Sequence, residues 1–360
     1  MDLKRIFSKD ACPTKVGGQA VLEGIMMKGE HRTAIVLRLP NQKLYIRTQP
    51  LAPKKKITKI PFVRGVMVFV DALVEGTRTL MYSADILEAH EEEGSTTYQK
   101  SKFDLWLEKK LGAKRAWNLM IYVSVVLAIL LTVGIFIIMP TWVLDLLAMV
   151  TSNVVVLNLV EGLFRILLFV LYVLAISRMK DIHRVFQYHG AEHKTIHCYE
   201  AGLELTPENC RPYYTLHPRC GTSFLMFVMI IALILFSLLG WPNLFWRITS
   251  RILLLPVIAG LGYELLKWAG RSDNWLVKVL SLPGLYLQKL TTAEPDTDQL
   301  EVAIAAMKSA LSGPDEPHYE GLCDLDGQPY VEPEEMDTTQ EKREAEREEA
   351  GDQDENQRIA

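Results

Sequence analysis

Hydrophobic residues along this chain gather in four long blocks that are separated by segments rich in charge. The first two blocks, residues 117–139 and 154–176, are each 23 residues long. The third and fourth blocks, residues 223–239 and 252–268, are shorter. A helix of about 20 apolar residues crosses the hydrocarbon core of a bilayer. The pattern therefore predicts a mainly α, polytopic membrane protein with four transmembrane helices.

Lysine and arginine between the blocks predict the orientation of these helices. Residues 140–153 contain neither residue type, whereas residues 177–222 contain six and the first 116 residues contain 21. Cytoplasmic loops of membrane proteins collect these cations. We therefore expect both termini, and the loop between the second and third helices, to be cytoplasmic.

Alternation of apolar and polar residues predicts a small β-element near the N-terminus. Residues 33–49 read as a hairpin with its turn at Pro40 and Asn41. The glycine-rich residues 16–29 precede it, and we expect them to form a tight turn packed near the membrane surface.

A polybasic segment, residues 54–64, leads into an apolar stretch at residues 62–74 that is too short to span a bilayer. This arrangement predicts an interfacial or re-entrant helix whose lysines bind anionic lipid headgroups. Nucleic acid is not the expected partner. Residues 54–64 are thus the predicted lipid contact.

Helical spacing returns after the fourth block. A short interfacial helix is followed by a predicted helix start near residues 295–298 and an amphipathic helix at residues 298–311. Its apolar face is expected to be a packing surface rather than a cofactor site. That face consists of Leu300, Ile304, Met307 and Leu311.

The net charge of −4 averages two unlike regions. The segment from residue 315 to the end has 17 acidic and 4 basic side chains, so the body of the protein is basic. Such a tail has too few apolar residues to fold, and it either binds a protein partner or only increases solubility.

The predicted segments are 1–60 (glycine-rich segment and hairpin), 61–116 (interfacial and cytoplasmic helices), 117–176 (first two spans), 177–222 (histidine-rich loop), 223–268 (last two spans), 269–314 (interfacial and amphipathic helices) and 315–360 (tail).

Candidate chemistry lies in the histidine-rich loop, where five of the eight histidines fall between residues 183 and 217. His189, Glu192 and His193 spell HxxEH, the inverse of the zincin motif. On a helix this spacing directs two imidazoles at one metal ion, while the carboxylate reaches the water that the metal activates. The motif predicts His189 and His193 as ligands and Glu192 as general base.

Two sources can supply the remaining ligands of such a site. One is Glu264, near the cytoplasmic end of the fourth block. The other is the set of His197, His217 and Cys220, whose nitrogen and sulfur atoms suit zinc. The sequence leaves both open, and it predicts a divalent metal, with zinc the expected ion.

Two charged residues inside the second block support a different function. Glu161 and Arg165 are one turn apart, and ionised groups at bilayer depth are costly unless they pair or face a polar cavity. They form either a self-contained ion pair or part of an ion path. The alternative function is therefore a non-enzymatic scaffold, assembly factor or transporter that uses this pair and the histidines.

Several motifs together resemble one known family. They are GGQAVLEGIMMKG, FQYHGAEHKTIHCYE, HPRCGTSF, RILLLPVIAGLGYELLK and LPGLYLQKLTTAEPDTDQLEVAIAAM, and they fall between about residues 12 and 310. The chain is similar to the bacterial membrane protein family designated domain of unknown function 1385, or YqhQ-like. This resemblance implies an uncharacterised integral protein of the bacterial plasma membrane and a predicted metal-dependent enzyme. With the motif chemistry, it leads us to expect a hydrolase at the cytoplasmic membrane face.

Overall fold

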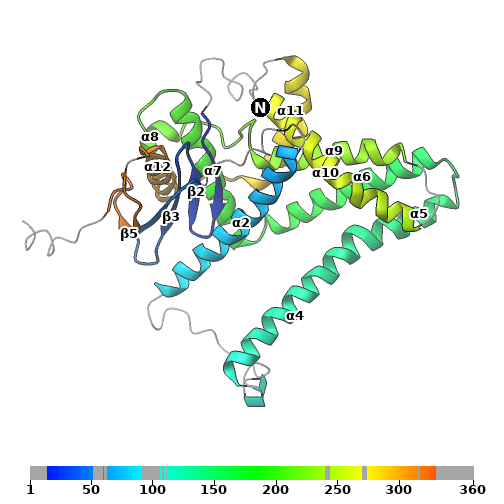
Figure 1. The fold of residues 1–360 in the computed structure, drawn as a ribbon, viewed down its shortest axis with the longest axis horizontal. Coiled ribbons are helices and arrows are strands. Elements are labelled where there is room, and N and C mark those ends of the chain that lie inside the picture. The colour runs from blue at the N-terminus through cyan, green and yellow to red at the C-terminus, as the bar shows by residue number, and fades with distance from the viewer. Residues whose placement is uncertain are drawn as a thin grey trace, which may run out of the picture.

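The computed structural model of the protein describes residues 14–51, 60, 63–90, 106–107, 109–110, 112–239, 244–269, 274–314 and 316–329. Most of the predicted lipid-binding segment, and the acidic tail beyond residue 329, lie outside the described residues. Figure 1 shows a sheet with helices on both of its faces at one end of the molecule and a group of long helices at the other.

Five strands form one antiparallel sheet in the order β1-β2-β3-β4-β5. The predicted hairpin is present, since β3 (Arg32–Arg38) pairs with β4 (Leu44–Pro50) around a turn in which Gln42 has a positive φ of 67°. The glycine-rich segment differs from our expectation of a single turn, because it forms a second hairpin of β1 (Gly17–Val21) and β2 (Gly24–Lys28). β5 (Glu320–Cys323) joins the far edge from the C-terminal part of the chain.

Both faces of the sheet are covered, which explains why its central strands are apolar at successive positions. Ile25 and Val36 face a core shared with the helices α7 (Lys180–Glu200) and α12 (Thr297–Leu311). Their neighbours Met26 and Ile35 face α2 (Val63–Ala89) on the other side. Adjacent strand residues point to opposite faces, so a buried sheet needs apolar residues on both.

The helix α12 follows the amphipathic pattern read from the sequence. Asp296 and Gln299 form a capping box at its start. Leu300, Ile304 and Met307 are buried against the sheet, as the helical spacing predicted. Leu311, the fourth residue of the predicted face, is partly exposed at the end of the helix.

Long helices form the other part of the molecule. α6 (Val154–Ile176), α9 (Gly221–Ser237), α10 (Leu244–Ala269) and α11 (Trp275–Thr291) pack together, with α9 in contact with each of the other three. α4 (Ala113–Val133) extends away from this group in Figure 1 and continues through a π-helical turn, η2 (Gly134–Ile138), into α5 (Met139–Ala148). α8 (Pro207–Cys210) is a short helix beside α7 and α12.

The prediction of four transmembrane helices is wrong. Among the described residues, α6 is the one helix that is long and apolar enough to cross a membrane. α9 is apolar but has only 17 residues. The block at 117–139 changes from α-helix to π-helix at η2, and α10 carries Arg247, Arg251, Glu264 and Lys267 among its 26 residues.

The charged residues of α6 form a pair within their own helix. Arg165 Nη2 lies 2.5 Å from Glu161 Oε1, and the Glu161 side chain is only 1% exposed. Asn158 donates from Nδ2 to the carbonyl of Leu239, 2.9 Å away. These three residues line a cavity of about 110 Å³ between α6 and α9. Glu161 and Arg165 thus form an ion pair along one helix, as expected for oppositely charged residues four apart.

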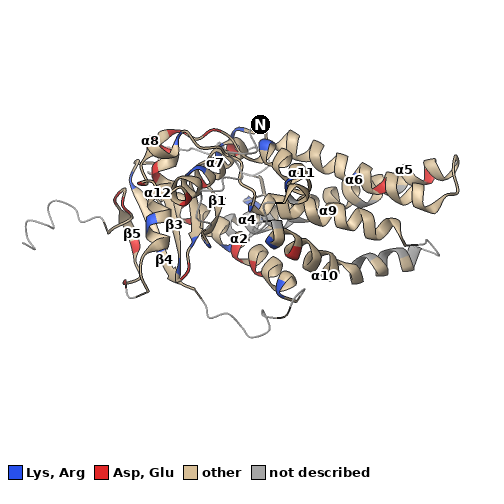
Figure 2. Cartoon of the chain, turned by 90° about the horizontal axis from the view of Figure 1, so that it is seen from above, with Lys and Arg blue, Asp and Glu red and all other residues tan. Residues whose placement is uncertain are grey.

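Charged side chains are unevenly distributed over the molecule. Figure 2 shows them concentrated around the sheet, α7, α8 and α12, whereas α9 and most of α6 are free of charge. The histidine-rich segment belongs to the charged part. It is not a loop, because α7 spans 21 residues from Lys180 to Glu200.

Candidate metal centre

α7 presents its histidines on one stripe because residues four apart share a helical face. The helix begins with Asp181 in its first turn, a favourable position for a carboxylate, and His197 lies in its last turn. Gly190 lies on the same helix and allows a very close approach to the segment after α11. A Cβ atom at this position would lie 2.0 Å from the carbonyl oxygen of Ala293.

Backbone carbonyls fix the orientation of the first two imidazoles. His189 Nδ1 lies 2.8 Å from the carbonyl oxygen of Thr291, and His193 Nδ1 lies 2.5 Å from that of Thr215. A carbonyl only accepts hydrogen bonds, so each Nδ1 carries the proton and each Nε2 keeps its lone pair. This is the arrangement in which second-shell acceptors prepare histidines for a metal.

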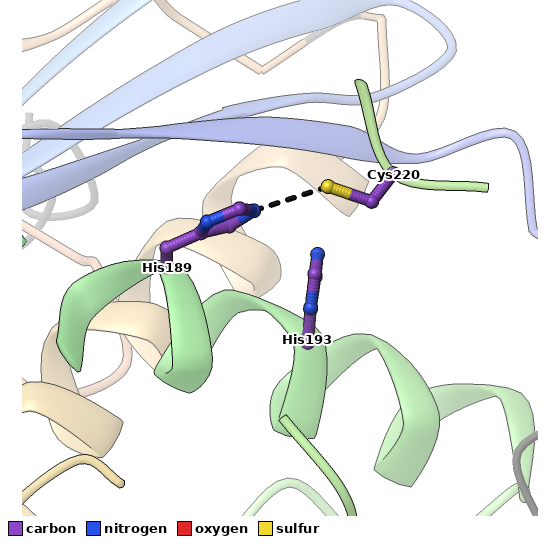
Figure 3. A group of neighbouring side chains, drawn as sticks. All are labelled: His189, His193 and Cys220. Carbon is purple, nitrogen blue, oxygen red and sulfur yellow. Dashed lines mark hydrogen bonds between the residues drawn. The ribbon is translucent and has the colours of Figure 1, made fainter. Parts of the chain in front are cut away.

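Cys220 brings a sulfur atom to these imidazoles. His189 Nε2 lies 3.1 Å from Cys220 Sγ, and Figure 3 shows both histidines of α7 directed toward the thiol. The rings of His189 and His193 have centroids 4.5 Å apart. The candidate ligand atoms of these three residues all lie within 4.8 Å of one another. We call His189, His193 and Cys220 the His189 cluster.

Protonation states in the His189 cluster match those that a metal requires. Burial lowers the pKa of His193 to about 4, which keeps its ring neutral. Burial alone would raise the pKa of the Cys220 thiol, but His193 and the Thr222 hydroxyl outweigh burial and lower it. Metal ligands are neutral imidazoles and thiolates, so the shifts of His193 and Cys220 both favour the forms that bind a metal.

Glu192 is buried beside this cluster. The carboxylate lies against Gly18 of β1, because a Cβ atom there would be 3.0 Å from Glu192 Oε1. Burial raises the pKa of Glu192 to about 7, and His189 opposes this rise. Oε2 has no hydrogen-bond partner although it is inaccessible to solvent. A buried oxygen without a partner indicates an ion or water that completes the site.

A second group, which we call the Glu200 cluster, comprises His197, Glu200 and His217. Glu200 Oε1 accepts from the backbone N–H of Thr14 at 2.7 Å and pairs with Arg219, while Oε2 lies 3.8 Å from His217 Nε2. Burial alone would raise the pKa of Glu200, but His217, Thr14 and Arg219 lower it to about 2.

The position of the proton on each histidine ring distinguishes the Glu200 cluster from the His189 cluster. His217 Nδ1 accepts a hydrogen bond from the backbone N–H of Arg219, so the proton of the neutral ring is on Nε2 and faces Glu200. His197 Nε2 lies 2.9 Å from the carbonyl of Leu216, so its proton is also on Nε2. The lone pair of His217 is therefore occupied. The His189 cluster is the better prepared metal site of the two.

The remaining predicted residues lie elsewhere. Glu264 is in neither cluster, because Arg64 on α2 holds both of its carboxylate oxygens in a bidentate pair. Glu161 and Arg165 pair on α6, away from the clusters. The set of His197, His217 and Cys220 is divided, since Cys220 joins the two histidines of the motif and the other two residues join Glu200.

Sequence reasoning missed the groups that orient the ligands. Thr215 and Thr291 act through backbone carbonyls, which carry no side-chain signal. Gly18 contacts Glu192 from a distant segment, and a Cβ there would lie 2.9 Å from the Glu192 Cδ atom. The only available signal was the double glycine at 17 and 18, since glycine permits close backbone approach.

The donors fit a zinc ion. Two imidazoles and a cysteine sulfur are donors that zinc prefers, whereas calcium and magnesium take oxygen ligands. Glu192 is outside this ligand group, but His189 and Cys220 act on its carboxylate, and its unsatisfied Oε2 is available as a base for a bound water. This set is able to bind a metal, activate water and accept its proton.

Fold and site together define a class: a protein with an α-layered antiparallel sheet, a bundle containing an apolar helix, and a His-His-Cys group with a buried glutamate nearby. The family described as "Protein of unknown function (DUF1385)" matches residues 60–313, and the chain belongs to this family. The chain is 34% identical over 308 residues to "Uncharacterized protein YqhQ" of Bacillus subtilis (strain 168), which covers 84% of this chain and 94% of that protein. No solved structure matches the chain.

Proposed function

We propose that the protein is a metal-dependent hydrolase that acts at the cytoplasmic face of the bacterial plasma membrane, where α6 anchors it. His189, His193 and Cys220 hold a divalent ion, with zinc the expected metal. Glu192 serves as the general base. The polybasic segment at residues 54–64 binds anionic lipid headgroups.

One observation carries the proposal. The two imidazoles of the motif each donate through Nδ1 to a backbone carbonyl, and both direct an Nε2 lone pair toward Cys220 Sγ. A neutral thiol has one proton, so without a metal it can donate a hydrogen bond to only one of the two Nε2 lone pairs. A cation between the three atoms gives each lone pair a partner.

The residues of the chain then have separate tasks in hydrolysis. The metal supplies a water of lowered pKa when it is bound. Glu192 accepts a proton from that water through the oxygen that has no partner in the structure. Gly18 of β1 packs closely against the other side of the carboxylate. Burial raises the pKa of Glu192 to about 7, which suits a base that takes and returns a proton near neutral pH.

Elemental analysis of the full-length protein, purified in detergent, tests this proposal. We expect about one zinc per chain in the wild type and its loss in His189→Ala with His193→Ala, because removing two of three ligands leaves no chelate. His183→Ala is the matched control, because His183 is on α7 but in neither cluster. Equal and negligible metal in all three proteins would refute the metal site.

Glu192→Gln separates metal binding from catalysis. The amide has the shape of the carboxylate but cannot accept a proton from water, so we expect the metal to remain while hydrolytic activity falls by 10²-fold or more. Cys220→Ser is the complementary change, because it weakens the ligand and keeps the base. Loss of metal in Glu192→Gln would show that Glu192 is a ligand instead of the base.

A further inference from the structure

Gln288 is a fully buried amide on α11, and it contacts both ends of the segment that carries Cys220. This segment runs from His217 to Ser223, and we call it the Cys220 segment. We propose that Gln288 is a positioning residue of the metal centre, because it holds this segment, and with it the Cys220 sulfur, at the place where a metal ion meets the two imidazoles. The inference rests on the proposed function.

The Gln288 amide uses all of its hydrogen-bonding groups on the Cys220 segment. The backbone N–H of His217 donates to Oε1 at 2.8 Å, and Nε2 donates to the His217 carbonyl at 2.9 Å. A backbone N–H only donates and a carbonyl only accepts, so this pairing fixes which end of the amide is the oxygen. Nε2 also donates to the Ser223 hydroxyl at 2.9 Å. Each end of the segment is therefore held by the same side chain.

Cys220 is bonded directly to both residues that Gln288 holds. The N–H of Cys220 donates to the His217 carbonyl at 3.3 Å, and the Cys220 carbonyl accepts from the N–H of Ser223 at 3.1 Å. Cys220 is also the N-cap residue of α9. With the backbone fixed on both sides, one torsion angle, χ1, sets the position of the sulfur. A displacement of the amide contacts therefore displaces the sulfur.

The same end of α11 contacts the groups that orient the two imidazoles. Thr291 supplies the carbonyl that accepts from His189. Thr292 Oγ1 lies 3.3 Å from Oγ1 of Thr215, and the Thr215 carbonyl accepts from His193. The last turn of α11 is therefore linked to all three members of the His189 cluster. A chelate needs fixed distances between its ligands, and one helix end sets them here.

A close approach of α11 to α9 brings the amide within reach. A Cβ atom at Gly284, one helical turn before Gln288, would lie 2.7 Å from Oγ and 2.8 Å from Cα of Ser223. Packing alone does not require an amide at position 288, because an apolar side chain of similar size fills the same space. Pairing of the buried backbone would by itself explain the amide. A test of positioning thus needs a signal from the metal–sulfur bond.

Cobalt in place of zinc in the full-length protein, purified in detergent, gives this signal. Cobalt bound to a thiolate has a near-ultraviolet charge-transfer band that cobalt bound to imidazoles alone lacks. Gln288→Met keeps the approximate size of the side chain and removes all three hydrogen bonds. We expect zinc to bind about 10–100-fold more weakly, as when other groups that orient ligands are lost, and the band per bound cobalt to decrease.

Asn158→Leu is the matched control. Asn158 is also a buried amide that donates to a backbone carbonyl, 2.9 Å away, but it lies on α6 and outside the His189 cluster. Its replacement should lower the stability of the protein, because a buried carbonyl loses its partner. Zinc affinity and the charge-transfer band should stay at the wild-type values.

Ser223→Ala keeps the test decisive if Gln288→Met does not fold. It removes one hydrogen bond of the amide, so we expect zinc affinity to fall about five-fold, the value of one net hydrogen bond. Ser281→Ala is its control, because Ser281 is on α11 and fully buried, yet its hydroxyl has no hydrogen-bond partner. Zinc affinity should be unchanged in Ser281→Ala.

The outcomes separate this inference from the proposed function. A wild type that binds zinc, with equal affinity and an equal charge-transfer band in Gln288→Met or Ser223→Ala, would overturn the positioning role alone. A wild type without metal overturns the hydrolase, and hydrogen–deuterium exchange then decides on Gln288. Gln288→Met should speed exchange in peptides covering residues 214–224 and not in those covering residues 300–310 of α12. Unchanged exchange at residues 214–224 would show that Gln288 does not hold the Cys220 segment.

Discussion

Gly190→Ala is the most direct test of how the site is packed. The new methyl group would be built 2.0 Å from the carbonyl oxygen of Ala293 and 3.1 Å from Cγ2 of Thr215. Favourable carbon contacts require about 3.5 Å or more, so α7 and the segment after α11 must separate by roughly 1.5 Å. Backbone atoms cannot move aside as a side chain does.

The expected magnitude follows from two opposing effects. Replacing a helical glycine by alanine stabilises a helix by about 1 kcal/mol. Overpacking a buried contact costs about 1–3 kcal/mol, and the upper end applies here because the opposing atom is in the backbone. We expect a net loss of about 2 kcal/mol in the free energy of unfolding. The contact is buried, so relaxation toward solvent is not available.

We expect Gly190→Ala to weaken metal binding as well as folding, because the segments that it displaces orient the imidazoles. Thr291 accepts from His189 and is two residues before Ala293, while Thr215 accepts from His193. Loss of such orienting groups typically costs 10–100-fold in metal affinity. A zinc competition assay with a chelator measures this effect, and urea unfolding followed by circular dichroism measures stability.

Gly162→Ala is the matched control on α6. A Cβ at Gly162 would lie 2.1 Å from Leu233 Cδ1, the end of a flexible side chain that can rotate away. We expect Gly162→Ala to change the zinc affinity and the free energy of unfolding very little. If Gly190→Ala is as stable as the wild type and binds zinc equally, the close approach of α7 to the segment after α11 does not hold the site.

Four further outcomes follow from the ion pairs and the buried acids. Glu264→Gln should keep full zinc content by elemental analysis, because this carboxylate is paired with Arg64; loss of zinc would instead make it a ligand. Glu161→Gln should destabilise the protein to urea by roughly 2 kcal/mol, and adding Arg165→Gln should recover part of this loss, since it removes the cation left without its partner. The stability that wild type gains over Glu200→Gln should be complete above pH 4.5 and fall as pH drops toward about 2, the depressed pKa of Glu200 in the folded state; a difference independent of pH would contradict the ion pairs. Zinc should dissociate on acidification in dialysis, because protons compete for the imidazoles and the thiolate.

Parts of the fold followed from local patterns. The hairpin of β3 and β4 was visible because its strands alternate around a turn sequence. The buried face of α12 was visible because Leu300, Ile304 and Met307 are spaced by helical turns. The pairing of β5 with β4 could not be read, since it joins segments about 275 residues apart. The transmembrane prediction counted apolar blocks, and it could not see that the fourth block belongs to a helix that begins at Leu244 and also carries Arg247 and Arg251.

The candidate site, like the fold, could be predicted only in part from the sequence. By itself, the sequence determined that His189, Glu192 and His193 share one face of a helix, because helical spacing is a local property of the backbone. Only the tertiary structure decided that Cys220 completes the group, that Glu264 pairs with Arg64, and that two backbone carbonyls set the tautomers. These contacts join segments from 22 to 200 residues apart. Which distant atoms meet depends on how whole helices and strands pack, and no single segment encodes that.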